Sequence, residues 1–266
     1  MTAPTEGGPA GADPAGLSTR RFVLATDLDG TFLGGSEDDR AKLYGFIEDN
    51  RDSVGLIFVT GRDPEFIGAL CRERGVPWPD YAVGDVGTTI ARVSKHTGVA
   101  PIPHLEDEIA AQWDNGGDRI KARLDGHPGL TLQPTDFRYR VSYDVDITRF
   151  DASACETIDE MGYDWLISDN RFFDVLPRGV SKGPSLKRLV EYLAIEPDRV
   201  LCAGDTLNDL SMLECGLPAV AVGNSEPALI DRLAGLAHLH MAHAHGAAGI
   251  LEAIRAFNLH DLPEGY

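Results

Sequence analysis

The sequence predicts an α/β protein, in which a parallel β-sheet covered by helices on both faces carries an inserted domain of mixed α and β structure. Two observations support this prediction. Short apolar runs alternate with helix-like segments in both end regions of the chain, as is typical of parallel sheets. Between Ala91 and Pro177 the hydrophobic pattern changes. In segments such as 138–146 polar and apolar residues alternate with a period of two, as in strands with one face exposed to solvent.

The elements follow in a simple order. Residues 1–19 are rich in Gly, Ala and Pro without hydrophobic periodicity, so we expect a flexible tail. The expected strands are 22–26, 54–59, 81–83, 200–203 and 219–222, and the expected helices among them include 38–50 and 64–74. The predicted division is a Rossmann-like core from 20–90 and 178–266, with an inserted α+β cap domain from 91–177.

Acidic side chains dominate the charge of the chain. Asp and Glu number 42 against 24 Lys and Arg, which gives a formal net charge of -18. A charge of this sign and size repels polyanions, so nucleic acid and anionic membranes are poor partners. A phosphorylated ligand would be repelled too, unless cations and backbone amides neutralise its site locally.

The cysteines and the apolar runs indicate the compartment. The chain has four cysteines, which are widely separated and form no CxxC pair, so we expect reduced and mostly buried thiols at Cys71, Cys155, Cys202 and Cys215. No apolar run approaches the roughly 18 residues needed to span a bilayer, and the N-terminus lacks a signal-peptide core. These features predict a cytoplasmic protein.

A pair of aspartates directly follows the first expected strand. Asp27 and Asp29 lie two residues apart, so alternation lets both carboxyl groups point toward one site. Two close carboxylates repel each other unless a cation or a proton intervenes. The pair alone could equally cap the following turn.

Three further segments supply the other groups that phosphoryl transfer needs. Thr60 offers a hydroxyl and an amide after the second strand, and Lys182 opens a helix where it can neutralise a transferring phosphoryl group. Asp205, Asn208 and Asp209 add two carboxylates and an amide after another strand. Because hard oxygen ligands suit Mg²⁺ rather than zinc, Mg²⁺ is the expected cofactor.

Four motifs in this order resemble those of the haloacid dehalogenase superfamily of phosphatases: DxDGT at Asp27, TGR at Thr60, SKG at Ser181 and GDxxND at Gly204. The resemblance covers nearly the whole chain after the tail. It implies that Asp27 attacks phosphorus and forms an aspartyl-phosphate. It also implies that Asp29 protonates the departing sugar oxygen and then activates the water that cleaves the intermediate.

The same resemblance implies the roles of the remaining residues. The metal ligands would be the Asp27 carboxylate, the Asp29 backbone carbonyl, Asp205 and Asp209. Thr60 and Lys182 would hold the phosphoryl oxygens. Contacts to substrate would come from Gly61, Arg62, Asn208, Gln133 and Arg140. The plainer alternatives are a solvated charge for Arg62 and, for Arg138 and Arg140, a salt-bridged outer face of a cap strand.

The insertion between TGR and SKG resembles the large αβ cap of one superfamily branch, which closes over small substrates and excludes water. Within that branch the chain resembles sucrose-phosphate and mannosylfructose-phosphate phosphatases, in segments 79–88, 132–134, 140–143, 174–177 and 249–254. Those relatives commonly carry Lys where this chain has Arg140. The resemblance implies a Mg²⁺-dependent phosphatase that acts on a small sugar phosphate.

Two other functions remain open. A phosphosugar mutase of the same superfamily would return the phosphoryl group to another hydroxyl, and the motifs barely separate it from a hydrolase. A signalling receiver domain also uses clustered aspartates and Mg²⁺, but it is much shorter and has no inserted cap.

A histidine-rich segment lies near the C-terminus. Its histidines alternate through residues 237–246 and could suggest a transition-metal site, at His238, His240, His243 and His245. No carboxylate or cysteine completes the cluster nearby in the sequence. We therefore expect an exposed connector before the last helix.

Overall fold

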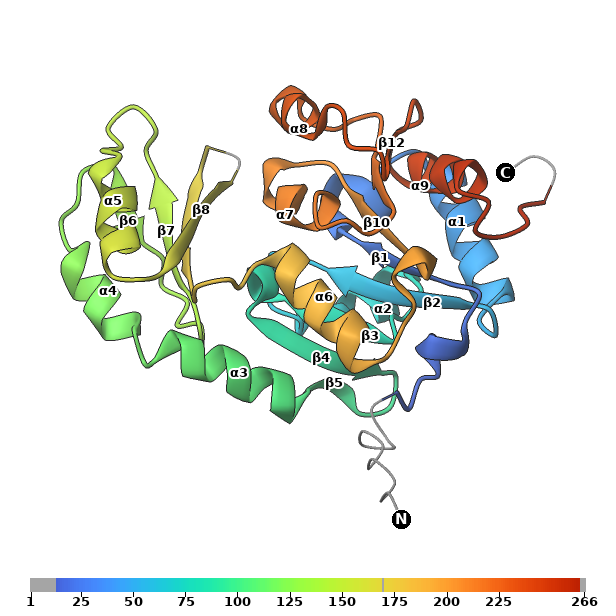
Figure 1. Ribbon diagram of the computed structural model, residues 1–266, viewed down its shortest axis with the longest axis horizontal. Helices are drawn as coiled ribbons and strands as arrows, with labels where there is room; N and C mark the ends of the chain where they lie inside the picture. The colour runs from blue at the N-terminus through green and yellow to red at the C-terminus, as the bar shows by residue number, and fades with distance from the viewer. Residues whose placement is uncertain (1–12, 169, 264–266) are drawn as a thin grey trace, which may run out of the picture.

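A computed structural model describes residues 13–168 and 170–263 (Figure 1). The strands of its larger sheet are β1 (Phe22–Thr26), β2 (Val54–Val59), β3 (Tyr81–Gly84), β4 (Thr89–Ser94), β5 (Gly98–Pro101), β10 (Val200–Gly204), β11 (Ala219–Ala221) and β12 (Leu239–Met241). This sheet has eight strands in the order β12-β11-β10-β1-β2-β3-β4-β5. Strands β12 to β3 run parallel, whereas β4 and β5 add to the edge in antiparallel fashion.

Helices cover both faces of the larger sheet, which confirms the predicted fold class. One face carries α1 (Glu37–Asp49), α2 (Phe66–Arg74) and α9 (Gly246–Ala256), and the other carries α6 (Lys182–Tyr192), α7 (Leu210–Leu213) and α8 (Pro227–Leu233). Alternate side chains of β1 enter the two cores, Phe22 on the first face and Val23 on the second. Because both faces are buried, the central strands are apolar throughout.

A second, smaller sheet lies to one side of the first (Figure 1). Its strands are β6 (Leu130–Leu132), β7 (Val141–Val145), β8 (Asp164–Ser168) and β9 (Phe172–Leu176), all antiparallel in the order β6-β7-β9-β8. Helices α4 (Gly117–Arg123) and α5 (Ser153–Glu160) contribute Ile120 and Ile158 to its own hydrophobic core. Helix α3 (Pro103–Trp113) joins the two parts, because Leu105 packs in the larger core and Trp113 in the smaller.

The strand pairing places the boundary between the two sheets later than predicted. Strand β4 crosses position 91 and β5 lies beyond it, yet both belong to the larger sheet. The reason is that an antiparallel edge hairpin shows the same alternation as the strands of an inserted domain. The second sheet therefore begins only after α3.

The predicted tail also ends earlier than expected. Residues 1–12 lie outside the described part of the chain, but Leu17 is fully buried in the larger core. It occupies the space above Gly55, where a Cβ atom would come within 3.0 Å of the Leu17 side chain. Ser18 donates two hydrogen bonds to the Asp13 carboxylate, of 2.7 Å and 2.8 Å. Leu17 packed against Gly55 and the hydrogen bonds between Ser18 and Asp13 thus hold this segment in place.

Among the described residues, no helix combines the length and apolar character that crossing a membrane requires.

Candidate active site

The predicted polar residues meet at one edge of the larger sheet. Asp27 follows β1, Thr60 follows β2 and Asp205 follows β10, and these three strands are parallel neighbours. Their carboxyl ends therefore lie at the same edge, where open α/β sheets bind ligands. Backbone hydrogen bonds extend the pairing past the strand ends, from the Asp27 amide to the Ala203 carbonyl and from the Thr60 amide to Val83, each 2.8 Å long.

Three aspartates form a buried acidic cluster. Asp27, Asp205 and Asp209 each place one carboxylate oxygen within 4.8 Å of the others, and none is more than 7% exposed. The Asp209 carboxylate accepts the amide hydrogens of Asp205 and Thr206 at 3.0 Å and 3.1 Å, which shapes the loop after β10. The Thr31 hydroxyl donates to Asp205 at 2.7 Å.

Lys182 supplies the positive charge in contact with this cluster. It is fully buried at the first residue of α6, and its Nζ donates to Asp27 at 2.7 Å, Asp209 at 2.6 Å and Asn208 at 2.9 Å. The ammonium group thus has all three of its hydrogens in hydrogen bonds. The surrounding carboxylates raise the pKa of Lys182 despite its burial, so it stays charged.

One lysine does not balance three buried carboxylates. Burial raises the pKa of Asp27 to about 8 and that of Asp205 to about 7, and the charge of Asp209 adds to both effects. A cation among these oxygens would favour the ionised forms. The residues therefore fit the expected Mg²⁺, because the cluster offers only oxygen ligands and lacks positive charge.

Asp29 lies outside the buried cluster, although it lines the same cavity. Its side chain is 57% exposed and forms a bidentate ion pair with Arg62, from Nε and Nη2 at 2.8 Å each. The Arg62 guanidinium also lies over the Phe66 ring, 5.1 Å from its centroid. The structure thus separates the two aspartates of the first motif, with Asp27 held by Lys182 and Asp29 by Arg62.

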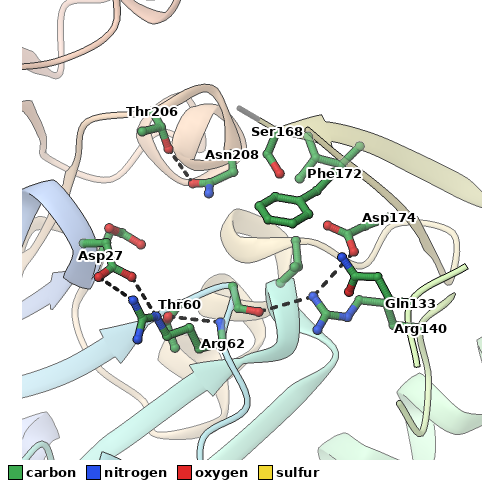
Figure 2. A pocket seen from close by; sticks show the side chains of 14 residues that line it. Asp27, Thr60, Arg62, Gln133, Arg140, Ser168, Phe172, Asp174, Thr206 and Asn208 are labelled. Atoms are coloured by element: carbon green, nitrogen blue, oxygen red, sulfur yellow. Dashed lines mark hydrogen bonds and ion pairs between the residues drawn. The ribbon is translucent and has the colours of Figure 1, made fainter. Parts of the chain in front are cut away.

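A cavity of about 480 Å³ opens between the two sheets at this point (Figure 2). The larger sheet and its loops line it with Asp27, Asp29, Thr60, Gly61, Arg62, Val86, Thr206 and Asn208. The smaller sheet and the connection between its strands β6 and β7 contribute Gln133, Arg140, Leu166, Ser168, Phe172 and Asp174. This volume is within the usual range for small-molecule sites, about 300–1,000 Å³.

Arg140 connects the two parts of the structure behind this cavity. It is 6% exposed, and its Nη1 donates to the Gly61 carbonyl at 3.2 Å. Carboxylate oxygens of Asp85 and Asp174 lie 3.6 Å from its guanidinium, which covers the Phe137 ring at 3.7 Å. The expectation that Arg138 and Arg140 occupy a strand face is wrong, because β7 begins only at Val141.

Gln133 and Arg138, which lie near Arg140 in the sequence, differ in whether they reach the cavity. Gln133 points toward the cavity beside Arg140 (Figure 2), and its amide donates to Asp144 at 3.1 Å. Arg138 lies outside this cavity and pairs with Glu106 at 2.6 Å. The structure therefore brings Gln133 and Arg140 to the cavity, and it leaves Arg138 in a contact between the segment before β7 and α3.

Asn224 is a site residue to which the sequence analysis assigned no role. Its amide nitrogen donates to the Gly30 carbonyl at 3.0 Å and to Asp205 at 3.4 Å, while its oxygen accepts from the Gly246 amide at 2.8 Å. It thereby joins the loop after β1, the loop after β10 and the start of α9. The sequence contained one signal for this residue. Asn224 follows Gly223 shortly after β11, just as Asp205 follows Gly204 at the end of β10.

The histidine-rich segment has a carboxylate partner that the sequence analysis missed. Glu252 of α9 contacts Nε2 of His240 at 2.9 Å and Nδ1 of His243 at 3.3 Å. The Glu252 carboxylate also accepts backbone amides of His243 and Ala244, and its pKa falls to about 2. Within the described residues, the Asp27 cluster is nevertheless the one group whose ligand atoms converge as a metal would require.

Comparison with known proteins relates this site to a group of sugar-phosphate enzymes. The sequence profile of the family described as sucrose-6F-phosphate phosphohydrolase matches residues 20–258. The glucosylglycerol-phosphate synthase of Pseudomonas anguilliseptica is 39% identical over 237 residues, which cover 89% of this chain but only 31% of that protein. The mannosylfructose-phosphate phosphatase of Agrobacterium fabrum is 29% identical over 252 residues, covering 89% of this chain and 97% of the relative.

Solved structures show the same relationship. The sucrose-phosphatase of Synechocystis sp. PCC6803, determined with sucrose and phosphate, superposes with a TM-score of 0.81 at 27% identity, covering 90% of this chain and 99% of that one. A haloacid dehalogenase-like hydrolase from Bacillus subtilis shares the fold, with a TM-score of 0.65 at 16% identity over 92% of this chain and 94% of that one.

Proposed function

This chain belongs to the sucrose-6F-phosphate phosphohydrolase family, and we propose that it hydrolyses the phosphate ester of a small sugar through an aspartyl-phosphate on Asp27. The observation that carries the proposal is the position of Asp27. Its carboxylate lies in the acidic cluster, is hydrogen-bonded to Lys182, and lines the cavity that the second sheet covers. A nucleophile, a cation and a space for substrate are thus together.

The first step forms a bond between Asp27 and phosphorus and breaks the bond from phosphorus to the sugar oxygen. Asp29 lines the same cavity on its solvent side, where it can give a proton to the departing oxygen. In the second step a water molecule attacks the aspartyl-phosphate, Asp29 takes its proton, and inorganic phosphate leaves. Arg62 holds both carboxylate oxygens of Asp29, so we assign it the orientation of that side chain.

The charge of the transferring group is balanced by the residues around it. Thr60, which lines the cavity, and Lys182, which contacts the Asp27 carboxylate, would bind the phosphoryl oxygens. Asp27, Asp205, Asp209 and the Asp29 backbone carbonyl would hold Mg²⁺. When bound, Mg²⁺ supplies positive charge that stabilises the negative charge developing on the phosphoryl group.

The second sheet is proposed to act as a cap over this site. It contributes Gln133, Arg140 and Phe172 to the cavity wall, and two chain connections join it to the larger sheet, through α3 and through the segment after β9. Closure of such a domain excludes water and orients the sugar. With the strand pairing considered, we place the cap between residues 102 and 177.

The names of the relatives suggest the substrate class. They concern sucrose-phosphate, mannosylfructose-phosphate and glucosylglycerol-phosphate, in each of which a sugar is linked to a second polyhydroxy unit. The chain spans about a third of the glucosylglycerol-phosphate synthase, so that enzyme's synthase activity need not extend to this part. We propose a phosphorylated glycoside of this kind as the substrate.

A direct assay tests the proposal. The purified chain is incubated with Mg²⁺ and each of these three esters, with glucose 6-phosphate as the simple-sugar control, and inorganic phosphate is measured. Release from at least one glycoside ester faster than from glucose 6-phosphate is expected. An isomeric sugar phosphate formed without phosphate release would indicate a mutase, and would overturn the hydrolase proposal.

A further inference from the structure

The turn that joins β3 to β4 has an unusual backbone. Its residues Asp85, Val86 and Gly87 all have positive φ, of 50°, 59° and 103°. Hairpin turns often need this left-handed conformation, and Asp and Gly adopt it readily. Valine does not, because its branched Cβ crowds the backbone there. The shape of the turn therefore explains Asp85 and Gly87, but it does not explain Val86.

Contacts on both sides hold the turn in this conformation. The Val86 amide donates to the Thr60 carbonyl at 3.2 Å. On the other side, the Ser185 hydroxyl donates to the Gly87 carbonyl at 2.7 Å, and a Cβ atom added to Gly87 would come within 2.4 Å of the Ser181 carbonyl oxygen. Backbone strain persists only where the surroundings fix the chain in this way.

The side chain of Val86 faces the catalytic cavity and not a hydrophobic core. It is 4% exposed, yet it belongs to none of the three hydrophobic clusters that the described residues form. It lines the cavity instead, and a Cβ atom added to Gly61 would lie 3.8 Å from its Cγ2. Gly61 directly follows Thr60, which we propose binds the phosphoryl group. Val86 is therefore close to the phosphate end of the cavity.

Val86 also differs in character from the other residues on its side of the cavity. The larger sheet and its loops otherwise contribute carboxylates, a guanidinium, hydroxyls and an amide, from Asp27, Asp29, Arg62, Thr60, Thr206 and Asn208. These groups bind charge and oxygen, whereas the carbon-bound hydrogens of a sugar need an apolar surface. Among the described residues, Val86 is the one apolar side chain that this wall offers.

We propose that Val86 determines specificity, by packing against carbon atoms of the sugar unit that carries the phosphate. This inference rests on the proposed function. The strained backbone is the consequence of placing a branched apolar side chain at a position that would suit glycine. A smaller residue would leave a gap beside the phosphorylated unit, and the preference for a sugar phosphate over a smaller phosphate compound would weaken.

Glycine and alanine variants at two valines test the strain. Val93 of β4 is 6% exposed, but it packs in a hydrophobic core and lies on an ordinary strand. There, alanine should be more stable than glycine, because glycine loses more freedom on folding. At Val86 the order should reverse, and Val86→Gly should melt a few degrees above Val86→Ala, because glycine adopts a positive φ freely. Thermal denaturation of the four variants measures both orders, and the same order at both positions would overturn the proposal.

Kinetics test the specificity. The kcat/KM is measured with Mg²⁺ for the glycoside ester that the unmodified chain hydrolyses fastest, and for acetyl phosphate, whose leaving group is far smaller. The ratio of the two values should fall about tenfold in Val86→Gly, the lower end of what one small apolar contact contributes to discrimination. It should stay the same in the matched control Val93→Gly. A constant ratio in Val86→Gly, or an equal fall in both variants, would overturn the proposal.

Binding separates a failure of this inference from a failure of the proposed function. Calorimetry on the Asp27→Asn background gives the Kd of each of the three glycoside esters without turnover. If the unmodified chain releases no phosphate, yet Val86→Gly weakens the binding of an ester about tenfold, the proposed function fails and the role of Val86 holds. Unchanged binding in Val86→Gly, or no binding of any ester before that change, would overturn the role of Val86.

Discussion

The two walls of the catalytic cavity are built differently. On the core side, Asp27, Lys182 and Asp209 are buried and joined by hydrogen bonds of 2.6–2.7 Å. On the cap side, Arg140 reaches its partners at 3.2–3.6 Å and Gln133 is half-buried. The comparison indicates that the core wall is organised before substrate arrives, whereas the cap wall has hydrogen-bonding capacity left for a ligand.

The difference follows from how each of the two sheets positions its side chains at the cavity. Parallel strands deliver their carboxyl ends to one edge, so the core side chains converge on short loops with little freedom. The cap side chains come from an antiparallel sheet and from the segment before β7, and their positions depend on how the cap sits on the core. Substitutions of polar residues in the core wall should therefore stop chemistry, and substitutions in the cap wall should alter the choice of sugar.

The largest effect is expected for Asp27→Asn, which removes the proposed nucleophile. Turnover should fall by roughly 10⁴-fold or more, the scale seen when a covalent nucleophile is lost. Phosphate release and the phosphate bound to acid-quenched protein are measured together, and both should vanish. Asp63→Asn, a change outside the cavity, is the matched control and should keep its activity. Retention of a tenth of the activity in Asp27→Asn would show that another group attacks phosphorus.

Asp29→Asn should have the next largest effect. It distinguishes the general-acid role proposed for Asp29 from the nucleophilic role proposed for Asp27. Loss of a general acid costs about 10²–10⁴-fold in the step that forms the intermediate with a sugar phosphate. The same step should slow much less with an aryl phosphate, because its phenolate leaves without a proton. Rapid-quench measurements of intermediate formation with both esters check this expectation. Equal fractional losses would contradict the acid role.

Arg140→Lys tests the cap wall and should have a smaller effect. Its guanidinium contacts Gly61 and lies between two carboxylates, a geometry that a lysine cannot reproduce. We expect KM for the sugar phosphate to rise about three- to tenfold, the scale of one hydrogen bond of about 1 kcal/mol. The kcat for a small aryl phosphate should change little. Arg138→Lys, whose ion pair with Glu106 lies outside the cavity, is the matched control. A kcat loss shared by both substrates would place Arg140 in the chemistry.

The smallest effect concerns stability and its dependence on pH. The folded-state pKa values of Asp27, about 8, and Asp205, about 7, lie above the ordinary value of 3.8. Between about pH 4 and pH 8 the folded protein therefore holds protons that the unfolded chain has released, so its free energy of unfolding falls as pH rises. Mg²⁺ favours the ionised carboxylates and should reduce this fall. Thermal denaturation in chelator and in Mg²⁺ should thus differ most near pH 8, by a few degrees. Identical pH profiles would argue against metal binding at the cluster.

Much of the site could be predicted because its residues sit in short segments at strand ends. Asp27, Thr60 and Asp205 each follow an apolar run, and parallel pairing must bring such positions to one edge. Asn224 follows the same pattern, but a lone asparagine after glycine has too many ordinary uses to stand out. Glu252 could not be paired with His240, because helix α9 and β12 meet only in the fold.

What the sequence by itself determined is therefore which residues form the core wall, and how strands and helices alternate, since both depend on local residue order. The tertiary structure decided which side chains share a contact across long stretches of chain. It placed β4 and β5 in the larger sheet, paired Arg62 with Asp29, and set Arg140 between the two sheets. These outcomes depend on side-chain packing and long-range pairing, which no local pattern of residues encodes.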